Sequence, residues 1–373
     1  MNLCQGRIGK QEGASLAGIA LVSSAVFVLD IGETYRYGNG TYISFPGAIF
    51  LAFMLFLLLA EAMRISGKKD LIELVDYAVG KFAGNLFVAI LCALLLVNAY
   101  CLLSRFSTMV HALIYMKTTP FPVFLWIVPV VVYIAFRGFE CVARMAKCFG
   151  LLLGVALLLE FLIPMRGYEA YRLFPLPTEH FDAIAADAFS GMFATGPALL
   201  AILCMARGLQ GVRSAKSAGT IGALISIALV ALTQLAIGLT YTSTELKSIF
   251  VPLYRLNLKL VQESYFFRLD KLALFAWLIG AIIASAYYLY GGASLFCRRW
   301  SRYDIRPAVI ALGVILLCVL AAERAWQYNM VQTAFSFVQR YGSWMLIVPF
   351  SAIAVIALIK THFMKRRHMN ETV

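Results

Sequence analysis

Ten apolar stretches divide this chain, and each is long enough to cross, or nearly cross, the hydrocarbon core of a bilayer. A spanning helix needs about 20 mostly apolar residues, and fewer where neighbouring polar residues are buried in a bundle. Backbone N–H and C=O groups find no water there, so segments of this length must be helical. The sequence therefore predicts an all-α polytopic membrane protein with about ten transmembrane helices. The stretches are 13–31, 43–63, 83–106, 121–136, 148–165, 186–206, 218–241, 270–296, 307–322 and 343–361.

The composition excludes a water-soluble globular domain. Apolar residues make up 62% of the chain and charged residues only 14%, whereas roughly a quarter of a soluble domain is charged. No linker or low-complexity tract separates a second unit. We therefore expect one transmembrane domain over residues 1–373.

The formal net charge of +13 is a topology signal and does not indicate nucleic-acid binding. If the N-terminus is cytoplasmic, most Lys and Arg residues fall in the N-terminus, the even-numbered loops and the C-terminal tail. An excess of Lys and Arg marks the cytoplasmic side of a membrane protein. Both termini are therefore predicted inside, with attraction to anionic lipids as a secondary effect.

Two of the ten stretches carry interruptions, and they hold matching places, first and sixth. The first contains Ser23-Ser24 at mid-depth, and the sixth contains Ser190-Gly191 followed by Thr195-Gly196-Pro197. Proline has no N–H to continue a helix and restricts the residue before it. Broken helices at equivalent places in two halves point to a transporter-type binding site. The pattern predicts two inverted five-helix repeats, about 13–165 and 186–361, with spans one and six broken.

Enzymatic chemistry and cofactor binding have no candidate residues. The chain has no phosphate-binding loop, nucleophile elbow or paired carboxylates within a span. Its eight cysteines form no CxxC spacing, and its four histidines match no metal-ligand spacing. We expect no enzyme activity, no cofactor and no metal site.

Three stretches together resemble the spore germination B-subunit family, the GerAB-like spore permeases of the amino acid–polyamine–organocation transporter superfamily. They are Arg137–Arg144 entering span five, Arg268–Tyr290 through span eight, and Gly80-Lys81 with Arg105 and Lys117–Pro120 around span three. The chain departs from the family pattern at two places. It has Ser23-Ser24-Ala25 where the family has a glycine-rich centre, and Gly196-Pro197 where Gly is often followed by Glu.

The resemblance implies a subunit of a nutrient receptor in the spore inner membrane or cell membrane. Such a subunit would bind a small germinant, specifically an amino acid, between spans one, three, six and eight. Partner subunits of the A and C types would read out its conformation. Two alternatives stay open: a permease that moves its ligand by alternating access, and a membrane scaffold that binds no ligand.

Polar and aromatic residues at mid-depth in these four spans are the candidate ligand-binding residues. Each also has a structural interpretation: hydroxyls bond to their own helix, small residues allow close packing, and Asn98 bonds between helices. Tyr287 is expected to face lipid, because adjacent residues cannot share one helix face. The candidates are Ser23, Ser24, Asn98, Thr195, Gly196, Tyr288 and Tyr290.

Overall fold

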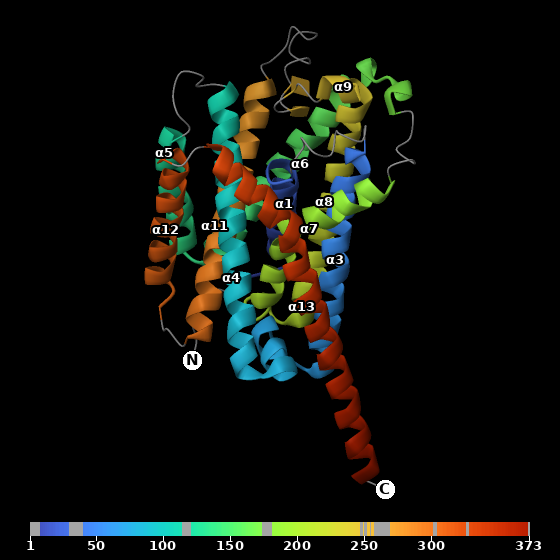
Figure 1. Cartoon of the computed structure of the whole chain (residues 1–373), viewed down its shortest axis with the longest axis vertical. Helices are drawn as coiled ribbons and strands as arrows, with labels where there is room; N and C mark the ends of the chain where they lie inside the picture. Colours follow the sequence, from blue (N-terminus) through green and yellow to red (C-terminus); the bar gives the residue numbers. More distant parts are fainter. Residues whose placement is uncertain are drawn as a thin grey trace.

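The computed structural model describes residues 8–29, 40–113, 121–173, 181–246, 249, 252–253, 255–256, 269–300, 304–325 and 328–371. Long helices run side by side along one axis (Figure 1), and no strand occurs within these ranges. Arg268 and Lys117–Pro120 lie outside them. The long helices are α1 (Lys10–Phe27), α3 (Thr41–Ser66), α4 (Leu71–Leu113), α5 (Phe121–Phe136), α6 (Phe139–Leu162), α7 (Phe181–Cys204), α8 (Val212–Thr240), α11 (Leu269–Arg299), α12 (Arg306–Ala325) and α13 (Tyr328–Glu371). Short helical turns are Ile163–Gly167, Ala170–Leu173 and α9 (Ser243–Leu246).

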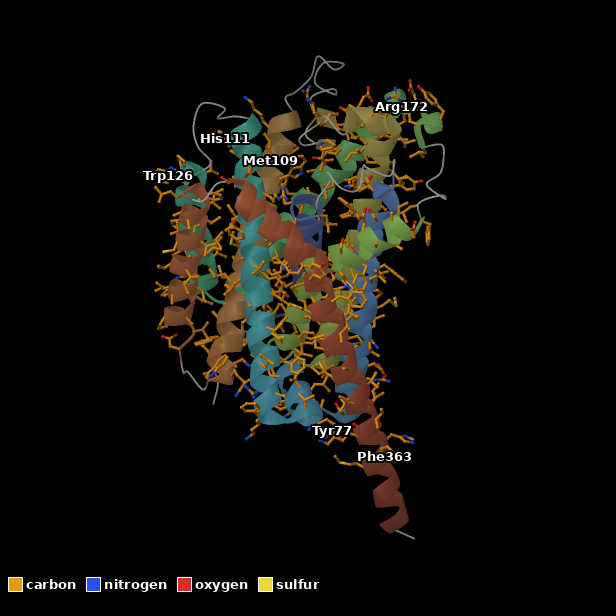
Figure 2. All side chains as sticks on the ribbon, viewed as in Figure 1. Tyr77, Met109, His111, Trp126, Arg172 and Phe363 are labelled. Atoms are coloured by element: carbon orange, nitrogen blue, oxygen red, sulfur yellow. The ribbon has the colours of Figure 1, made fainter. Side chains whose placement is uncertain are left out.

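The helices have the length and the outer surface of a membrane bundle. Seven of those described are long and apolar enough to span a membrane, and Pro122–Phe136 and Arg306–Ala322 are shorter apolar helices. Large apolar side chains point outward around the bundle, as Trp126 does at the outer edge (Figure 2), where it is 77% exposed. The predicted all-α polytopic class is confirmed, while the count of ten spans stays a prediction.

Helix contacts repeat between the first five long helices and the last five. α3 packs on α7 as α8 packs on α1, and α6 packs on α1 as α13 packs on α7. α4 pairs with α11, α3 with α8 and α5 with α12. The Ile8 amide before α1 donates to the Gly208 carbonyl after α7 at 3.0 Å, so α1 begins where α7 ends. Matching helices of the two halves therefore make the same contacts, and the start of α1 meets the end of its counterpart α7. This is the arrangement of an inverted repeat.

Small residues bring the mirrored helix pairs close together. At the seam between α1 and α8, a Cβ on Gly222 would lie 2.7 Å from Ala17 Cβ and 2.8 Å from the Ala14 carbonyl oxygen. At the seam between α3 and α7, a Cβ on Gly191 would lie 2.8 Å from Ala48 Cβ. In a bilayer, close packing of this kind drives helix association, because lipid tails are as apolar as the side chains.

The Gly222→Ala substitution is therefore expected to destabilise the protein by about 1–3 kcal/mol, because the added methyl meets a backbone atom and forces the helices apart. Thermal unfolding in detergent measures this loss. Gly154→Ala is the matched control, since nothing lies within 4 Å of its added Cβ. It should be neutral or raise stability by up to about 1 kcal/mol through helix propensity. Equal unfolding temperatures for the two variants would contradict the close-packed seam.

The backbone breaks expected in spans one and six do not occur at the predicted residues. Helix α1 continues through Ser23-Ser24 to Phe27, where the Val28 amide donates to the Ser24 carbonyl at 2.9 Å. Helix α7 continues through Gly196-Pro197 to Cys204. Two serines remove no backbone donor, and a single proline removes only one. The residues after α1, 30–39, lie outside the described ranges.

Leu71, Leu74, Val75 and Ala78 share one helical face, a pattern that predicts a short amphipathic helix on the cytoplasmic membrane surface, closed by Gly80. The first part of α4 is that helix. Leu71, Leu74 and Val75 are buried on one face. Gly80 ends this segment with φ 83° and ψ 169°, and the chain then turns into the long part of α4. The positive φ favours glycine at this corner. The amphipathic face packs against the bundle.

Segments that the charge pattern assigns to one side of the membrane meet at one end of the bundle, which we call the basic end. Lysines at this end interact with residues of other segments. Lys147 forms an ion pair with Glu12 at 3.6 Å, and Lys216 with Glu61 at 3.0 Å, while Lys360 donates a hydrogen bond to the Tyr77 carbonyl at 2.8 Å. The C-terminal part of α13 leaves the bundle at this end (Figure 1). The grouping of these connections is confirmed, and their cytoplasmic location stays a prediction.

Candidate functional site

A buried hydroxyl pair joins α1 to α11. Ser24 Oγ lies 2.6 Å from the hydroxyl of Tyr288, and both residues are fully buried. The Tyr288 hydroxyl also lies 3.5 Å from the Ala20 carbonyl oxygen, one turn earlier in α1. Two of the predicted site residues are therefore in direct contact. Because Tyr288 donates to the Ala20 carbonyl, Ser24 donates to Tyr288, and both hydroxyl protons have an acceptor.

Tyr287 also belongs to this junction, and the expectation that it faces lipid is wrong. It is fully buried, and its hydroxyl donates to the Ala198 carbonyl of α7 at 2.8 Å. Its ring lies 5.7 Å from that of Tyr288. Adjacent residues do point to different faces, but helices surround this part of α11. The small residues Ala281, Ala284 and Gly291 in the same helix allow neighbouring helices to pack closely against it, and they are the sequence signal that could have placed Tyr287 inside the bundle.

Asn98 joins α4 to α7 at the point where Pro197 removes a backbone donor. In a regular helix the Phe193 carbonyl would accept from the N–H four residues later, which is Pro197. Asn98 Nδ2 donates to that carbonyl at 3.2 Å, and to its own Leu94 carbonyl at 3.0 Å. The predicted interruption of span six therefore amounts to one missing hydrogen bond, which a side chain from α4 replaces. The helix consequently continues.

This replacement predicts an energetic coupling between Asn98 and Pro197. We expect Asn98→Ala to cost about 1 kcal/mol, the scale of interhelical hydrogen bonds in membranes, because the Phe193 carbonyl loses its donor. In a Pro197→Ala background the helix supplies its own N–H, so the cost should fall. Unfolding of the two single variants and the double variant measures the difference. Strictly additive costs would contradict the pairing.

Three other predicted residues contact different helices. Thr195 Oγ1 donates to the Ala48 carbonyl of α3 at 3.2 Å. A Cβ on Gly196 would lie 3.0 Å from Leu346 of α13. The ring of Tyr290 stacks on Phe139 of α6 with centroids 5.8 Å apart. These are packing contacts and hydrogen bonds between helices, and none of them is made to the Ser24–Tyr288 pair.

Ser23 faces α11 directly beside Ser24. Its Oγ would lie 3.0 Å from a Cβ on Gly280, so the missing side chain at Gly280 makes room for it. Ser23 is 2% exposed. It therefore extends the polar surface of α1 that faces α11.

Several buried polar atoms near this junction have no hydrogen-bond partner within the described ranges. They include the Asn98 carbonyl oxygen, Ser285 Oγ and Trp277 Nε1. Ser285 and Trp277 lie on α11, and Trp277 packs edge-on against Phe27 with ring centroids 6.3 Å apart. A buried polar group without a partner costs about 1–3 kcal/mol, so each asks for an explanation. Neither Ser285 nor Trp277 is among the predicted site residues, because neither residue type is unusual in a span; Trp277 belongs to the stretch Arg268–Tyr290, which carries the family resemblance.

A buried ionic cluster joins the ends of α7 and α11 at the basic end. Asp70 is fully buried and pairs with Arg207 Nε at 2.6 Å and with Arg298. Arg298 also donates to the Cys204 carbonyl, the last residue of α7, at 2.6 Å. Glu73 pairs with Arg207; burial alone would raise its pKa, but the Lys69 N–H and the Arg207 charge lower it. The cluster therefore connects the ends of α7 and α11 to the start of α4.

The fold is that of polytopic membrane transporters. The chain matches a Na+-coupled sialic acid symporter with a TM-score of 0.63 and 11% identity, over 90% of this chain and 79% of the other. It matches a nucleobase-cation-symport-1 family transporter with a TM-score of 0.60 and 12% identity, over 90% and 76%. A manganese transporter from Eremococcus coleocola gives 0.58 and 12%, over 93% and 76%. At these identities the likeness shows the fold alone.

The sequence places the chain in a particular family of that fold. A family model described as spore germination protein, the spore permeases, matches residues 45–325. The chain belongs to this spore germination family, as the resemblance in spans three, five and eight implies. A comparison with curated protein sequences finds no match.

Proposed function

We propose that this protein is the membrane subunit of a spore germinant receptor, and that it binds a small germinant, most simply an amino acid, at the junction of α1, α4, α7 and α11. The observation that carries the proposal is the Asn98 carbonyl oxygen. It is buried and has no hydrogen-bond partner among the residues that the structure describes, while the amide nitrogen of the same side chain is held between two helices. An oriented, unused acceptor is suited to an ammonium group.

The Ser24–Tyr288 pair supplies the complementary chemistry. The Tyr288 hydroxyl donates to the Ala20 carbonyl over a long 3.5 Å, and a carboxylate would accept that proton in place of this weak hydrogen bond. The two halves of the junction approach α7 at Phe193 and Ala198, through Asn98 and Tyr287 respectively. These positions are five residues apart, about 7.5 Å along the helix axis. Asn98 and Tyr287 therefore contact α7 less than two turns apart, which supports a single small zwitterion as the ligand.

Ligand binding at this junction would change the conformation of the basic end. A ligand shifts a conformational equilibrium when it binds one state better than another, and net transport is not required. The same helices that carry the junction, α7 and α11, end at the Asp70–Arg207–Arg298 cluster. We propose that receptor subunits of the A and C types read a change there, in a membrane where both termini are cytoplasmic.

A thermal-shift panel of the common amino acids on the purified protein tests the proposal. A ligand at 100 times its dissociation constant stabilises the folded state by about 2.7 kcal/mol, so the matching amino acid should raise the unfolding temperature by several degrees. If no amino acid shifts the transition, the proposed ligand class is wrong.

A permease working by alternating access is the second candidate, favoured by the structural likeness to symporters. It differs from the receptor in one measurable respect. Proteoliposomes that contain this chain without partner subunits would accumulate the labelled amino acid found by the panel. Binding without uptake supports the sensing role, and sustained uptake supports the permease.

A further inference from the structure

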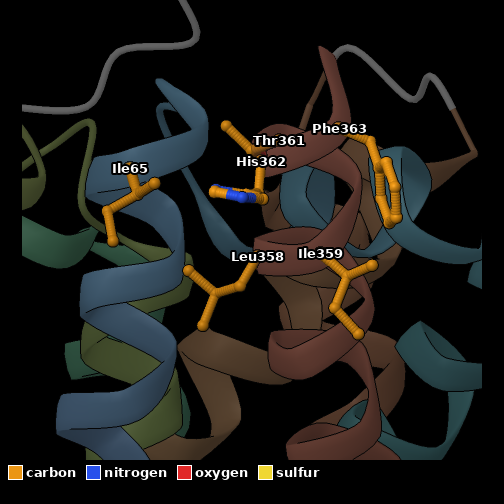
Figure 3. Close-up of a pocket in the computed structure, with 6 residues that line it drawn as sticks. All are labelled: Ile65, Leu358, Ile359, Thr361, His362 and Phe363. Atoms are coloured by element: carbon orange, nitrogen blue, oxygen red, sulfur yellow. The ribbon is translucent and has the colours of Figure 1, made fainter. Parts of the chain in front are cut away.

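An apolar groove separates α3 from α13 at the basic end of the bundle. It has a volume of about 440 Å³ and lies between the last turn of α3 and the part of α13 that leaves the bundle. Figure 3 shows Ile65 of α3 facing Leu358 and His362 of α13. The wall is almost entirely apolar, and Ile65, Ile359 and Phe363 are exposed. Its lining residues are Ile65, Leu358, Ile359, Thr361, His362 and Phe363.

Two ammonium groups converge beside this groove. The Nζ atoms of Lys68 and Lys360 lie 4.5 Å and 5.0 Å from the centroid of the Tyr77 ring. The Tyr77 hydroxyl lies 3.3 Å from Oγ1 of Thr361, which lines the groove. The lysines and the apolar wall are therefore parts of one surface.

Lys68 and Lys360 bring positive charge to this surface. Within the described ranges no carboxylate forms an ion pair with Lys68 or Lys360. Glu73, whose charge acts on Lys68, is already paired with Arg207. Two like charges gathered at one aromatic ring repel each other, so the pair favours an anion from outside the chain.

We propose that this surface binds an anionic phospholipid, with one acyl chain along the groove and the phosphate at Lys68 and Lys360. Basic pockets between transmembrane helices recognise anionic headgroups through such lysines. The apolar wall next to the charges distinguishes a lipid from a free anion, which would gain nothing from it. The position also fits, because Tyr77 and Phe363 lie at the end where α13 leaves the bundle (Figure 2).

Native mass spectrometry of the full chain in detergent tests this site. The probes are dioleoylphosphatidylglycerol, dioleoylphosphatidylcholine with the same acyl chains, and glycerol 3-phosphate as the soluble headgroup. We expect the anionic lipid to bind more tightly than the zwitterionic lipid. The Lys68→Gln/Lys360→Gln variant should bind the anionic lipid roughly 30-fold more weakly, and Ile65→Trp, which fills the groove, should also weaken it.

Lys10→Gln/Lys81→Gln is the matched control, because it removes the same charge without touching the groove. It should bind the anionic lipid as the native chain does, and thermal unfolding confirms that each variant is folded. Equal binding of the two lipids would overturn the proposal, as would equal losses in the two double variants. If glycerol 3-phosphate displaces the lipid at equal concentration, or Ile65→Trp binds normally, the site takes a free anion and the lipid assignment is wrong.

Discussion

Replacing Asp70 by asparagine is expected to destabilise the protein by about 3–5 kcal/mol, the cost of breaking a buried ion pair from one side. Asp70 is fully buried, and the Arg298 side chain is only 10% exposed. Removing the carboxylate charge leaves the buried Arg298 guanidinium without its counter-charge, while Arg207 keeps only its pair with Glu73. Thermal or denaturant unfolding of the purified variant measures the loss.

An exposed ion pair provides the matched control for this effect. Glu140→Gln breaks the pair with Arg144, whose side chains are 39% and 70% exposed. Exposed pairs contribute about 0–1 kcal/mol, so the control should unfold close to the native protein. If Asp70→Asn costs no more than Glu140→Gln, the cluster does not hold the ends of α7 and α11 together.

Introducing a phenyl ring at Ser24 is expected to abolish the response to germinant. Ser24 is fully buried and touches Tyr288, so the ring would fill the space that the proposed ligand needs. Spores that carry Ser24→Phe should accumulate the protein and yet fail to germinate with the amino acid that the panel identifies. Germination rate against amino acid concentration is the measurement.

Two further variants separate binding from folding. Ser24→Ala keeps the space and removes only the hydroxyl, so it should weaken the response roughly tenfold, about 1.4 kcal/mol. Ser351→Phe adds the same bulk on α13, where Ser351 bonds only its own helix, and should germinate normally. A normal response from accumulated Ser24→Phe protein would place the ligand elsewhere.

The sequence predicted the helical architecture because two patterns determine it directly. Long apolar stretches must be helical in a bilayer, and the spacing of Leu71, Leu74 and Val75 identified the short amphipathic helix. Gly80 was correctly placed as its end, since only glycine readily adopts the positive φ found there. Charge counting grouped the connections that meet at the basic end.

The candidate site was only partly predictable, because it depends on which helix faces which. Ser24, Tyr288 and Asn98 lie at the junction, whereas Thr195, Gly196 and Tyr290 contact α3, α13 and α6. Pro197 indicated an interruption, but no local pattern shows that an amide from α4 replaces the lost bond. Helix continuity here depends on a residue about a hundred positions away, which single-sequence patterns do not reveal.

The most direct test of the central claim is photoaffinity labelling with a diazirine analogue of the amino acid that binds, followed by peptide mapping. The account predicts labels on α1 around Ser24, on α4 around Asn98 and on α11 around Tyr288, all removed by excess unmodified amino acid. Labels confined to the outer surface of the bundle, or to the groove between α3 and α13, would contradict it.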